Sequence, residues 1–187
     1  DDASTDNTAN IIKKYEQMYP KIIKPIYQKE NQYSKGSKYF WDLLFSNAKG
    51  KYIAICEGDD YWTDSTKLQK QVDFLKENKK YMACYHNTGI LRENKNKNNL
   101  ELISNTIKDI FKIEDFAKGK IYFHTSSLIF RFNDKIKKKI ITHYSHKTFG
   151  DPFLSFLLAS LGPIKYINRV MSVYRIHNNG LWSSLSR

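Results

Sequence analysis

Residues 52–62 read Tyr-Ile-Ala-Ile-Cys-Glu-Gly-Asp-Asp-Tyr-Trp, a short apolar run followed directly by three carboxylates. The run Tyr52–Cys56 lacks polar alternation, which is typical of a strand buried on both faces of a parallel sheet. In open α/β sheets, ligands bind just beyond the carboxyl ends of the strands. We therefore expect the acidic stretch that starts at Glu57 to lie at a binding site on the edge of a sheet.

The sequence before residue 87 alternates between helical and strand patterns. Helical spacing of apolar residues predicts three helices, which end at Pro20, before Gly50 and after Leu75. Strands are predicted over residues 22–27, 52–56 and 81–86, and the third helix is expected to carry Leu68, Val72 and Leu75 on one side. This alternation indicates an open α/β sheet with right-handed crossovers. Because the order starts at a turn into a helix, we expect the first βα unit to lie upstream of Asp1.

The second half of the chain has a weaker alternation. Residues 93–99 are polar and of low complexity, so they are expected to form an exposed loop or hairpin tip. Helices are predicted over residues 113–118, 134–141 and 151–161, and strands over residues 126–132, 164–167 and 170–176. Residues 124–127 form a polar cluster, for which a turn is favoured over a lining of an acceptor site.

Length and composition limit the class of protein. The chain has 187 residues, 41% of them hydrophobic and 27% charged, which predicts one ordinary globular domain. No apolar run approaches the roughly 20 residues that a membrane span needs. Cys56 and Cys84 both lie in apolar runs and are expected to be buried thiols in a reducing compartment.

The net charge is +12 and is unevenly distributed along the chain. Residues 1–64 hold 9 basic and 10 acidic side chains, whereas residues 65–187 hold 22 and 9. Such a field favours an anionic partner, which leaves nucleic acid, acidic lipid headgroups and a phosphorylated substrate open. A solvated lysine-rich surface is the plain alternative.

Asp59 and Asp60 admit two interpretations from their own chemistry. Adjacent carboxylates repel each other, and a hard divalent cation such as Mg²⁺ or Mn²⁺ offsets that repulsion, with waters and substrate phosphates as its other ligands. The alternative is that the two aspartates only cap the turn that follows them.

Six short motifs carry a resemblance to a known family. They are Asp1–Asp6, Ala48–Ile53, Glu57–Asp64, Lys67–Leu75, Gly150–Leu154 and Tyr174–His177. In this order and spacing they resemble the family 2 glycosyltransferases, of the nucleotide-diphospho-sugar transferase type. The resemblance implies a Rossmann-like, A-type glycosyltransferase fold with a mostly parallel sheet flanked by helices. It also implies a single domain, in which residues 1–92 form the donor-binding half and residues 93–187 the acceptor-side half.

The resemblance also implies roles for individual residues. Asp151 falls at the position of the catalytic base. The residues implied to bind the nucleotide-sugar are Asp2, Lys35, Asp59, Asp60 and Arg175, with Asp2 at the position that reads the base. Those implied to bind Mn²⁺ or Mg²⁺ are Asp59, Asp60 and His177.

The function that the resemblance implies is metal-dependent, inverting sugar transfer from a nucleotide-diphospho-sugar, with UDP as the expected nucleotide. The acceptor is expected to be a cell-surface glycan precursor or a lipid-linked molecule. The enzyme is expected in the cytoplasm, with contact to an anionic inner membrane face. One alternative is an inactive fragment or binding module that keeps the fold. A basic nucleic-acid-binding protein is the other, and it is disfavoured because no nucleic-acid-binding motif is present.

Overall fold

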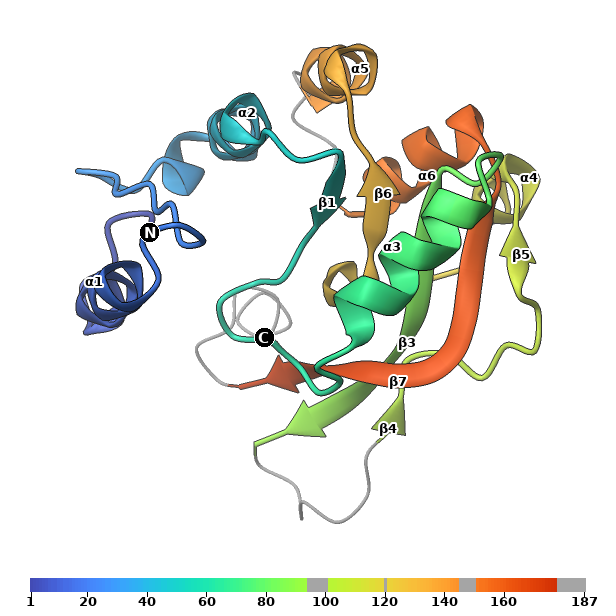
Figure 1. Ribbon diagram of the computed structural model, residues 1–187, viewed down its shortest axis with the longest axis horizontal. Helices are drawn as coiled ribbons and strands as arrows, with labels where there is room; N and C mark the ends of the chain where they lie inside the picture. The colour runs from blue at the N-terminus through green and yellow to red at the C-terminus, as the bar shows by residue number, and fades with distance from the viewer. Residues whose placement is uncertain (94–100, 120, 145–150, 178–187) are drawn as a thin grey trace. The chain divides into compact units, whose positions relative to one another are not determined.

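The computed structural model describes residues 1–93, 101–119, 121–144 and 151–177. They belong to two compact units, Asp1–Ala48 with Lys137–Thr148, and Lys49–Ile136 with Phe149–Arg187. Figure 1 shows the elements of both units. The first unit holds α1 (Thr8–Met18), the 3₁₀ turn η1 (Tyr33–Lys35), α2 (Ser37–Asn47) and most of α5 (Asp134–Tyr144).

The strand predicted over residues 22–27 does not form. The segment starts in a turn and then has no regular secondary structure, and Asp1 pairs with its end: the N-terminal amine donates to Ile26 O (2.9 Å) and the Asp1 carbonyl accepts from Gln28 N–H (3.0 Å). That is the bonding pattern of a parallel bridge, one residue long. The prediction was wrong because an apolar run becomes a strand only where a neighbouring strand pairs with it over several residues.

The second unit is built on a seven-stranded sheet in the order β1-β6-β3-β7-β2, with β4 paired to β3 and β5 paired to β7. The strands are β1 (Tyr52–Ala54), β2 (Tyr61–Trp62), β3 (Ala83–Arg92), β4 (Glu101–Leu102), β5 (Ile110–Phe111), β6 (Ile129–Arg131) and β7 (Ile164–Ile176). The fold is α/β, as predicted, but the sheet is mixed rather than mostly parallel. Among the described strands, β3 and β7 form the parallel pair, and the other pairs are antiparallel.

β7 is one long strand where the sequence predicted two. Its register with β3 shifts after His86↔Ile167, and pairing resumes at Asn87↔Val170. Asn168 and Arg169 therefore bulge out of the ladder, which explains the polar break in the sequence. On its other side, the C-terminal part of β7 pairs with β2 at the edge of the sheet, where Tyr61 lies opposite Val173.

Helices cover both faces of the central strand β3. On one side α3 (Lys67–Glu77) packs Leu75 against Cys84, Tyr81 and Ile129, and Figure 1 shows this helix in front of β3 and β6. On the other side Tyr85 stacks on Phe123 and its hydroxyl bonds Ser155 of α6 (Asp151–Leu161), 2.7 Å away. The remaining helix, α4 (Ile113–Ala117), places Phe116 edge-on to Phe111 and Phe123.

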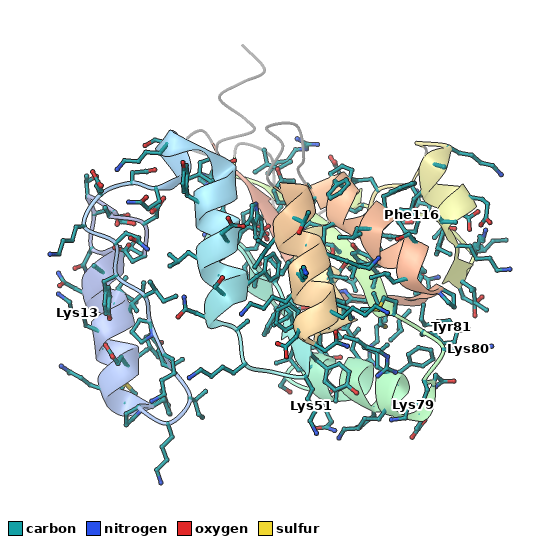
Figure 2. The ribbon with its side chains drawn as sticks, turned by 90° about the horizontal axis from the view of Figure 1, so that it is seen from above. Lys13, Lys51, Lys79, Lys80, Tyr81 and Phe116 are labelled. Carbon is teal, nitrogen blue, oxygen red and sulfur yellow. The ribbon has the colours of Figure 1, made fainter. Side chains whose placement is uncertain are left out.

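The turn from α3 into β3 is basic and is anchored by an aromatic ring. Figure 2 labels Lys79, Lys80 and Tyr81 at this turn. Tyr81 is buried edge-on to Phe74 of α3, while both lysines are exposed. Tyr81 therefore fixes the end of α3 on the sheet.

Several predictions about local structure are confirmed and three about burial are wrong. α2, α4, α5 and α6 form where helices were predicted, and residues 125–127 form a 3₁₀ turn, η2. β1 is only three residues long and half-buried, and Cys56 is exposed after it, whereas Cys84 is buried. Leu68 is 41% exposed, because α3 turns Lys67 and Gln71 toward the sheet. The predicted loop over residues 93–99 lies outside the described residues except for Glu93.

Among the described helices, none is both long and apolar enough to cross a membrane.

Candidate active site

The acidic stretch forms a tight loop between β1 and β2. Asp60 N–H donates to Glu57 O at 3.2 Å, which closes the turn around Gly58. The chain then enters β2, whose pairing with β7 fixes the far end of the loop. Three carboxylates are thus held on four residues at the edge of the sheet, as the sequence predicted.

One face of this loop is open to solvent. The side chain of Asp59 is 42% exposed, and its Oδ2 lies 3.2 Å from Nε2 of His177. His177 follows directly on the last residue of β7. The structure therefore brings together two of the three residues that the sequence predicted as metal ligands.

The other face of the loop is buried. The side chain of Asp60 is 1% exposed, and its Oδ1 accepts a hydrogen bond from Arg175 N–H at 3.1 Å. Its Oδ2 has no hydrogen-bond partner among the described residues and lies 3.5 Å from His124 Nδ1. Burial, with smaller effects from the charges of Glu57 and Asp59, raises the pKa of Asp60 to about 7. Asp60 is thus much easier to protonate than an ordinary aspartate.

Glu57 and His124 complete this buried cluster. Glu57 Oε1 accepts from Thr125 Oγ1 at 2.5 Å, whereas its Oε2 has no partner among the described residues. Glu57, Asp60 and His124 each present one ligand atom, and these atoms lie within 4.8 Å of one another. Burial lowers the pKa of His124, which favours the neutral imidazole that binds metals.

The turn at residues 124–127 contacts β7 and α3 at the back of the site. The ring of His124 stacks on Tyr174 of β7 at 4.3 Å between centroids, and its Nδ1 bonds Ser126 Oγ at 2.9 Å. Ser126 Oγ donates to Ser172 of β7, and Gln71 of α3 donates to Ser127 O. The sequence predicted the turn, but nothing in it showed that the turn contacts the acidic loop.

Asp151 begins α6 in the same unit. Burial, with a smaller contribution from the charge of Glu57 in the acidic loop, raises the pKa of its carboxyl group to about 6. Its carbonyl accepts from Ser155 Oγ, which in turn bonds Tyr85 in the core. A carboxylate with a pKa near 6 is suited to accept a proton at neutral pH.

Two further side chains are placed around these carboxylates. The Arg175 guanidinium pairs with Glu93 at 2.6 Å, while its backbone holds Asp60. Tyr122, which sequence reasoning missed, is half-exposed. Its pKa is raised to about 12 by desolvation of the hydroxyl and then by the charge of Asp151. A lone tyrosine before the turn gave no signal that would have marked it.

Asp2 and Lys35 lie in the first unit. The two carboxylate oxygens of Asp2 accept from the backbone N–H groups of Gln32 (2.8 Å) and Tyr33 (2.9 Å). Lys35 pairs with Glu30. The structure thus gives Asp2 a loop-closing role within its own unit, and the nucleotide-binding roles of Asp2 and Lys35 stay predictions.

The donor set fits a hard divalent cation. Asp59 and His177 present an oxygen and a nitrogen toward each other at the solvent-facing side of the loop. Behind them, the unpartnered oxygens of Glu57 and Asp60 concentrate negative charge in a sheltered place. Carboxylate oxygens are the ligands that Mg²⁺ and Mn²⁺ prefer.

A mixed sheet flanked by helices, with an acidic loop where β1 ends, defines an A-type glycosyltransferase fold. The crystal structure of Staphylococcus aureus TarS, residues 1–349, has a similar fold, with a TM-score of 0.64 and 18% sequence identity; the match covers 94% of this chain and 49% of that one. The chain belongs to glycosyl transferase family 2, whose family model matches residues 1–141.

Sequence relatives agree with this family. An uncharacterised protein of Mycobacterium tuberculosis is 33% identical over 187 residues, which is 98% of this chain and 51% of the relative. The glucosyltransferase WfaP of Escherichia coli is 38% identical over 46% of this chain and 32% of its own length. The putative teichuronic acid biosynthesis glycosyltransferase TuaG of Bacillus subtilis is 35% identical over 41% of this chain and 29% of its own length. The chain spans about half the length of the mycobacterial relative.

Proposed function

We propose that this chain carries the catalytic site of a metal-dependent, inverting glycosyltransferase, which transfers a sugar from a nucleotide-diphospho-sugar to a glycan or lipid-linked acceptor. The observation that carries the proposal is the pairing of Asp59 with His177 on the open face of the acidic loop. WfaP is named for transfer from UDP-glucose to a GlcNAc-diphosphoundecaprenol acceptor, which supports UDP as the donor nucleotide and a lipid diphosphate as the acceptor class.

The cation site is assigned first to Asp59 and His177. When bound there, Mn²⁺ or Mg²⁺ would offset the charge that develops on the leaving diphosphate. Asp60 remains a predicted ligand, and its unpartnered Oδ2 is the atom it would offer. Through Oδ1 it also fixes the backbone of Arg175, two residues before His177. Arg175 is proposed to contact the diphosphate with its guanidinium, and Asp2 and Lys35 to contact the nucleotide.

Asp151 is proposed as the catalytic base. Its carboxylate takes the proton of the acceptor hydroxyl as that oxygen bonds to the anomeric carbon, and the bond from this carbon to the diphosphate breaks. One such displacement inverts the anomeric configuration. General-base catalysis of this kind contributes typically about 10²–10⁴-fold to the rate, and the raised pKa of Asp151 places its protonation change near pH 6.

A cytoplasmic location with contact to an anionic membrane is part of the proposal. Both cysteines are free thiols, which suits a reducing compartment. α5 contains Lys135, Lys137, Lys138 and Lys139, and clustered lysines are attracted to acidic lipid headgroups. Binding to vesicles with acidic lipids should therefore appear at low salt and vanish at high salt. If no binding occurs at low salt, the membrane part of the proposal is wrong.

The experiment that tests the enzymatic proposal is calorimetric titration of the chain with UDP, with and without Mn²⁺. We expect binding that requires Mn²⁺ and is lost in His177→Ala. Asp73→Asn is the matched control, because Asp73 is an exposed carboxylate on α3 and its loss should leave binding unchanged. UDP binding that is equally strong without a divalent cation would contradict the metal-dependent site.

A further inference from the structure

Lys67 is a buried cation at the start of α3. Its side chain is 1% exposed, and its Nζ has no hydrogen-bond partner among the described residues. Other lysines of α3 behave ordinarily: Lys70 pairs with Asp64 at 2.6 Å, and the side chain of Lys76 is 60% exposed. Burying an amine without a hydrogen bond disfavours folding. A side chain that carries such a cost in a stable fold invites a functional explanation.

The contact that Lys67 makes is with an indole. Its Nζ lies 4.4 Å from the ring centroid of Trp62 on β2, a cation–π distance, and tryptophan is the best partner for such contacts. Burial lowers the pKa of Lys67 to about 8, so the amine still carries its charge at neutral pH. Lys67 therefore holds the plane of the Trp62 ring.

Trp62 in turn holds the turn at the back of the site. Its Nε1 donates to Ser126 O at 2.9 Å. The same turn places Ser126 Oγ against His124 and Thr125 Oγ1 against Glu57. A movement of the indole would therefore displace His124 and Thr125, the two residues of the turn that contact the acidic loop.

α3 reaches this turn by two routes from one face. Gln71, one helical turn after Lys67, donates directly to Ser127 O at 2.9 Å and to Cys84 O at 3.0 Å. Lys67 reaches the turn indirectly, because it contacts the indole of Trp62, which bonds Ser126. Side chains four residues apart lie on the same face of a helix, so the two contacts brace adjacent residues of the turn.

We infer that Lys67 is a positioning residue, which acts through Trp62 to hold the turn at residues 124–127 against the acidic loop. The inference rests on the proposed function for its catalytic consequence. Lys67→Met should affect stability and activity differently, because methionine keeps most of the apolar stem and removes the unpartnered amine. Replacing buried charged groups by apolar ones of similar volume is often neutral or stabilising.

The first test compares Lys67→Met with Lys76→Met. We expect Lys67→Met to unfold at the same or a higher temperature, yet to lower kcat for UDP release from UDP-glucose by about tenfold, with little change in KM, as expected when transition-state alignment is lost. Lys76→Met should change neither quantity. A lower unfolding temperature together with unchanged kcat would make Lys67 merely structural and overturn the inference.

A double-mutant cycle tests the route through the indole. Trp62→Phe keeps an aromatic ring but removes the N–H that binds Ser126. If Lys67 acts through this bond, Lys67→Met should cause little further loss of kcat in the Trp62→Phe background, whereas independent effects would multiply. If the two losses of kcat multiply in the double variant, Lys67 does not act through the bond from Trp62 to Ser126.

Amide hydrogen exchange supplies a readout that needs no turnover. Ser127 N–H and Leu128 N–H bond to His124 O and Thr125 O within the turn. We expect Lys67→Met to speed exchange at these amides by about threefold or more, as local opening becomes easier, and Lys76→Met to leave it unchanged. If exchange is faster but the chain neither binds UDP nor turns over a sugar nucleotide, the proposed function is wrong, while the positioning of the turn by Lys67 still holds. Unchanged exchange would overturn the inference even in an active enzyme.

Discussion

The two faces of the acidic loop differ in burial, although the residues that form them are neighbours. On the open face, Asp59 is 42% exposed and faces His177. On the buried face, Asp60 is 1% exposed and faces His124 and Glu57. Burial, rather than residue type, therefore separates the two aspartates: Asp59 faces solvent and His177, and Asp60 is tied to the backbone of β7.

This difference explains how one short loop can present an exposed carboxylate to solvent and still stay in place. Carboxylates that only face water would repel one another and leave the loop free to move. Here Thr125 and Arg175 N–H each donate to one of the inner carboxyl groups, and the raised pKa of Asp60 lets a proton relieve part of the repulsion.

The largest expected effect comes from Asp151, the half-buried carboxylate outside the loop. Asp151→Asn removes the proposed base and should lower kcat by about 10²–10⁴-fold. In the wild type, kcat should rise with pH through about 6, because the base must lose its proton and its pKa lies near that value. Steady-state assays of UDP release between pH 5 and 8 measure both. A variant with wild-type turnover would remove Asp151 from the mechanism.

Next comes the open face itself. Asp59→Asn should lower kcat/KM for a UDP-sugar by about 10²–10³-fold, because it removes a charge that holds the cation at the leaving group. Its unfolding temperature should change little, since an exposed side chain away from the core contributes little to stability. Assays at saturating Mn²⁺, with thermal unfolding alongside, check this. A large loss of stability would show that Asp59 holds the loop in place, as the residues of the buried face do.

The buried face should respond mainly in stability. The pKa of Asp60 is about 7 in the folded chain and near 4 when unfolded, so the folded state binds more protons between these values. Stability without metal should therefore fall as pH rises from about 4 to 7, by on the order of 2–4 kcal/mol from this group. Asp60→Asn should flatten that slope. Urea unfolding in EDTA at several pH values measures it, and an equally steep slope in the variant would rule out Asp60 as its source.

The smallest effect is expected at the link between the turn and the loop. Thr125→Val keeps the shape of the side chain but removes the hydroxyl that donates to Glu57 Oε1. Leaving this carboxylate oxygen without its donor should destabilise the chain by about 1–3 kcal/mol. Thr106→Val is a matched control, because Thr106 is remote from the acidic loop in sequence and its hydroxyl accepts from Lys108 N–H on an exposed segment. Equal losses of stability in the two variants would mean that the hydrogen bond to Glu57 contributes no more to stability than the one on the exposed segment.

The sequence predicted those features that depend on a short stretch of chain. The acidic loop follows an apolar strand, α6 starts at Asp151, and the motif that ends at His177 places this residue beside Asp59. Each of these depends on local patterning or on motif order. The mixed direction of the sheet was not predicted, because apolar runs show that strands exist but not which strands pair.

The buried polar residues were also missed for a physical reason. Periodicity assigned Leu68 to the same side of α3 as Val72 and Leu75, yet the helix buries Lys67 and Gln71. Both meet partners outside the helix: Lys67 meets the ring of Trp62 on β2, and Gln71 meets the carbonyl of Ser127. A hydrophobicity pattern treats lysine and glutamine as solvent-facing, so it cannot identify positions where tertiary packing buries them.

The most direct test of the contrast between the two faces is titration of the chain with Mn²⁺ alone, followed by electron paramagnetic resonance of the free ion. The account predicts that Asp59→Asn and His177→Ala each weaken Mn²⁺ binding by tenfold or more, at about 1.4 kcal/mol per tenfold, while Glu57→Gln and His124→Gln change it much less. The opposite result, with binding lost in Glu57→Gln and His124→Gln but kept in Asp59→Asn, would place the cation on the buried face and contradict the assignment.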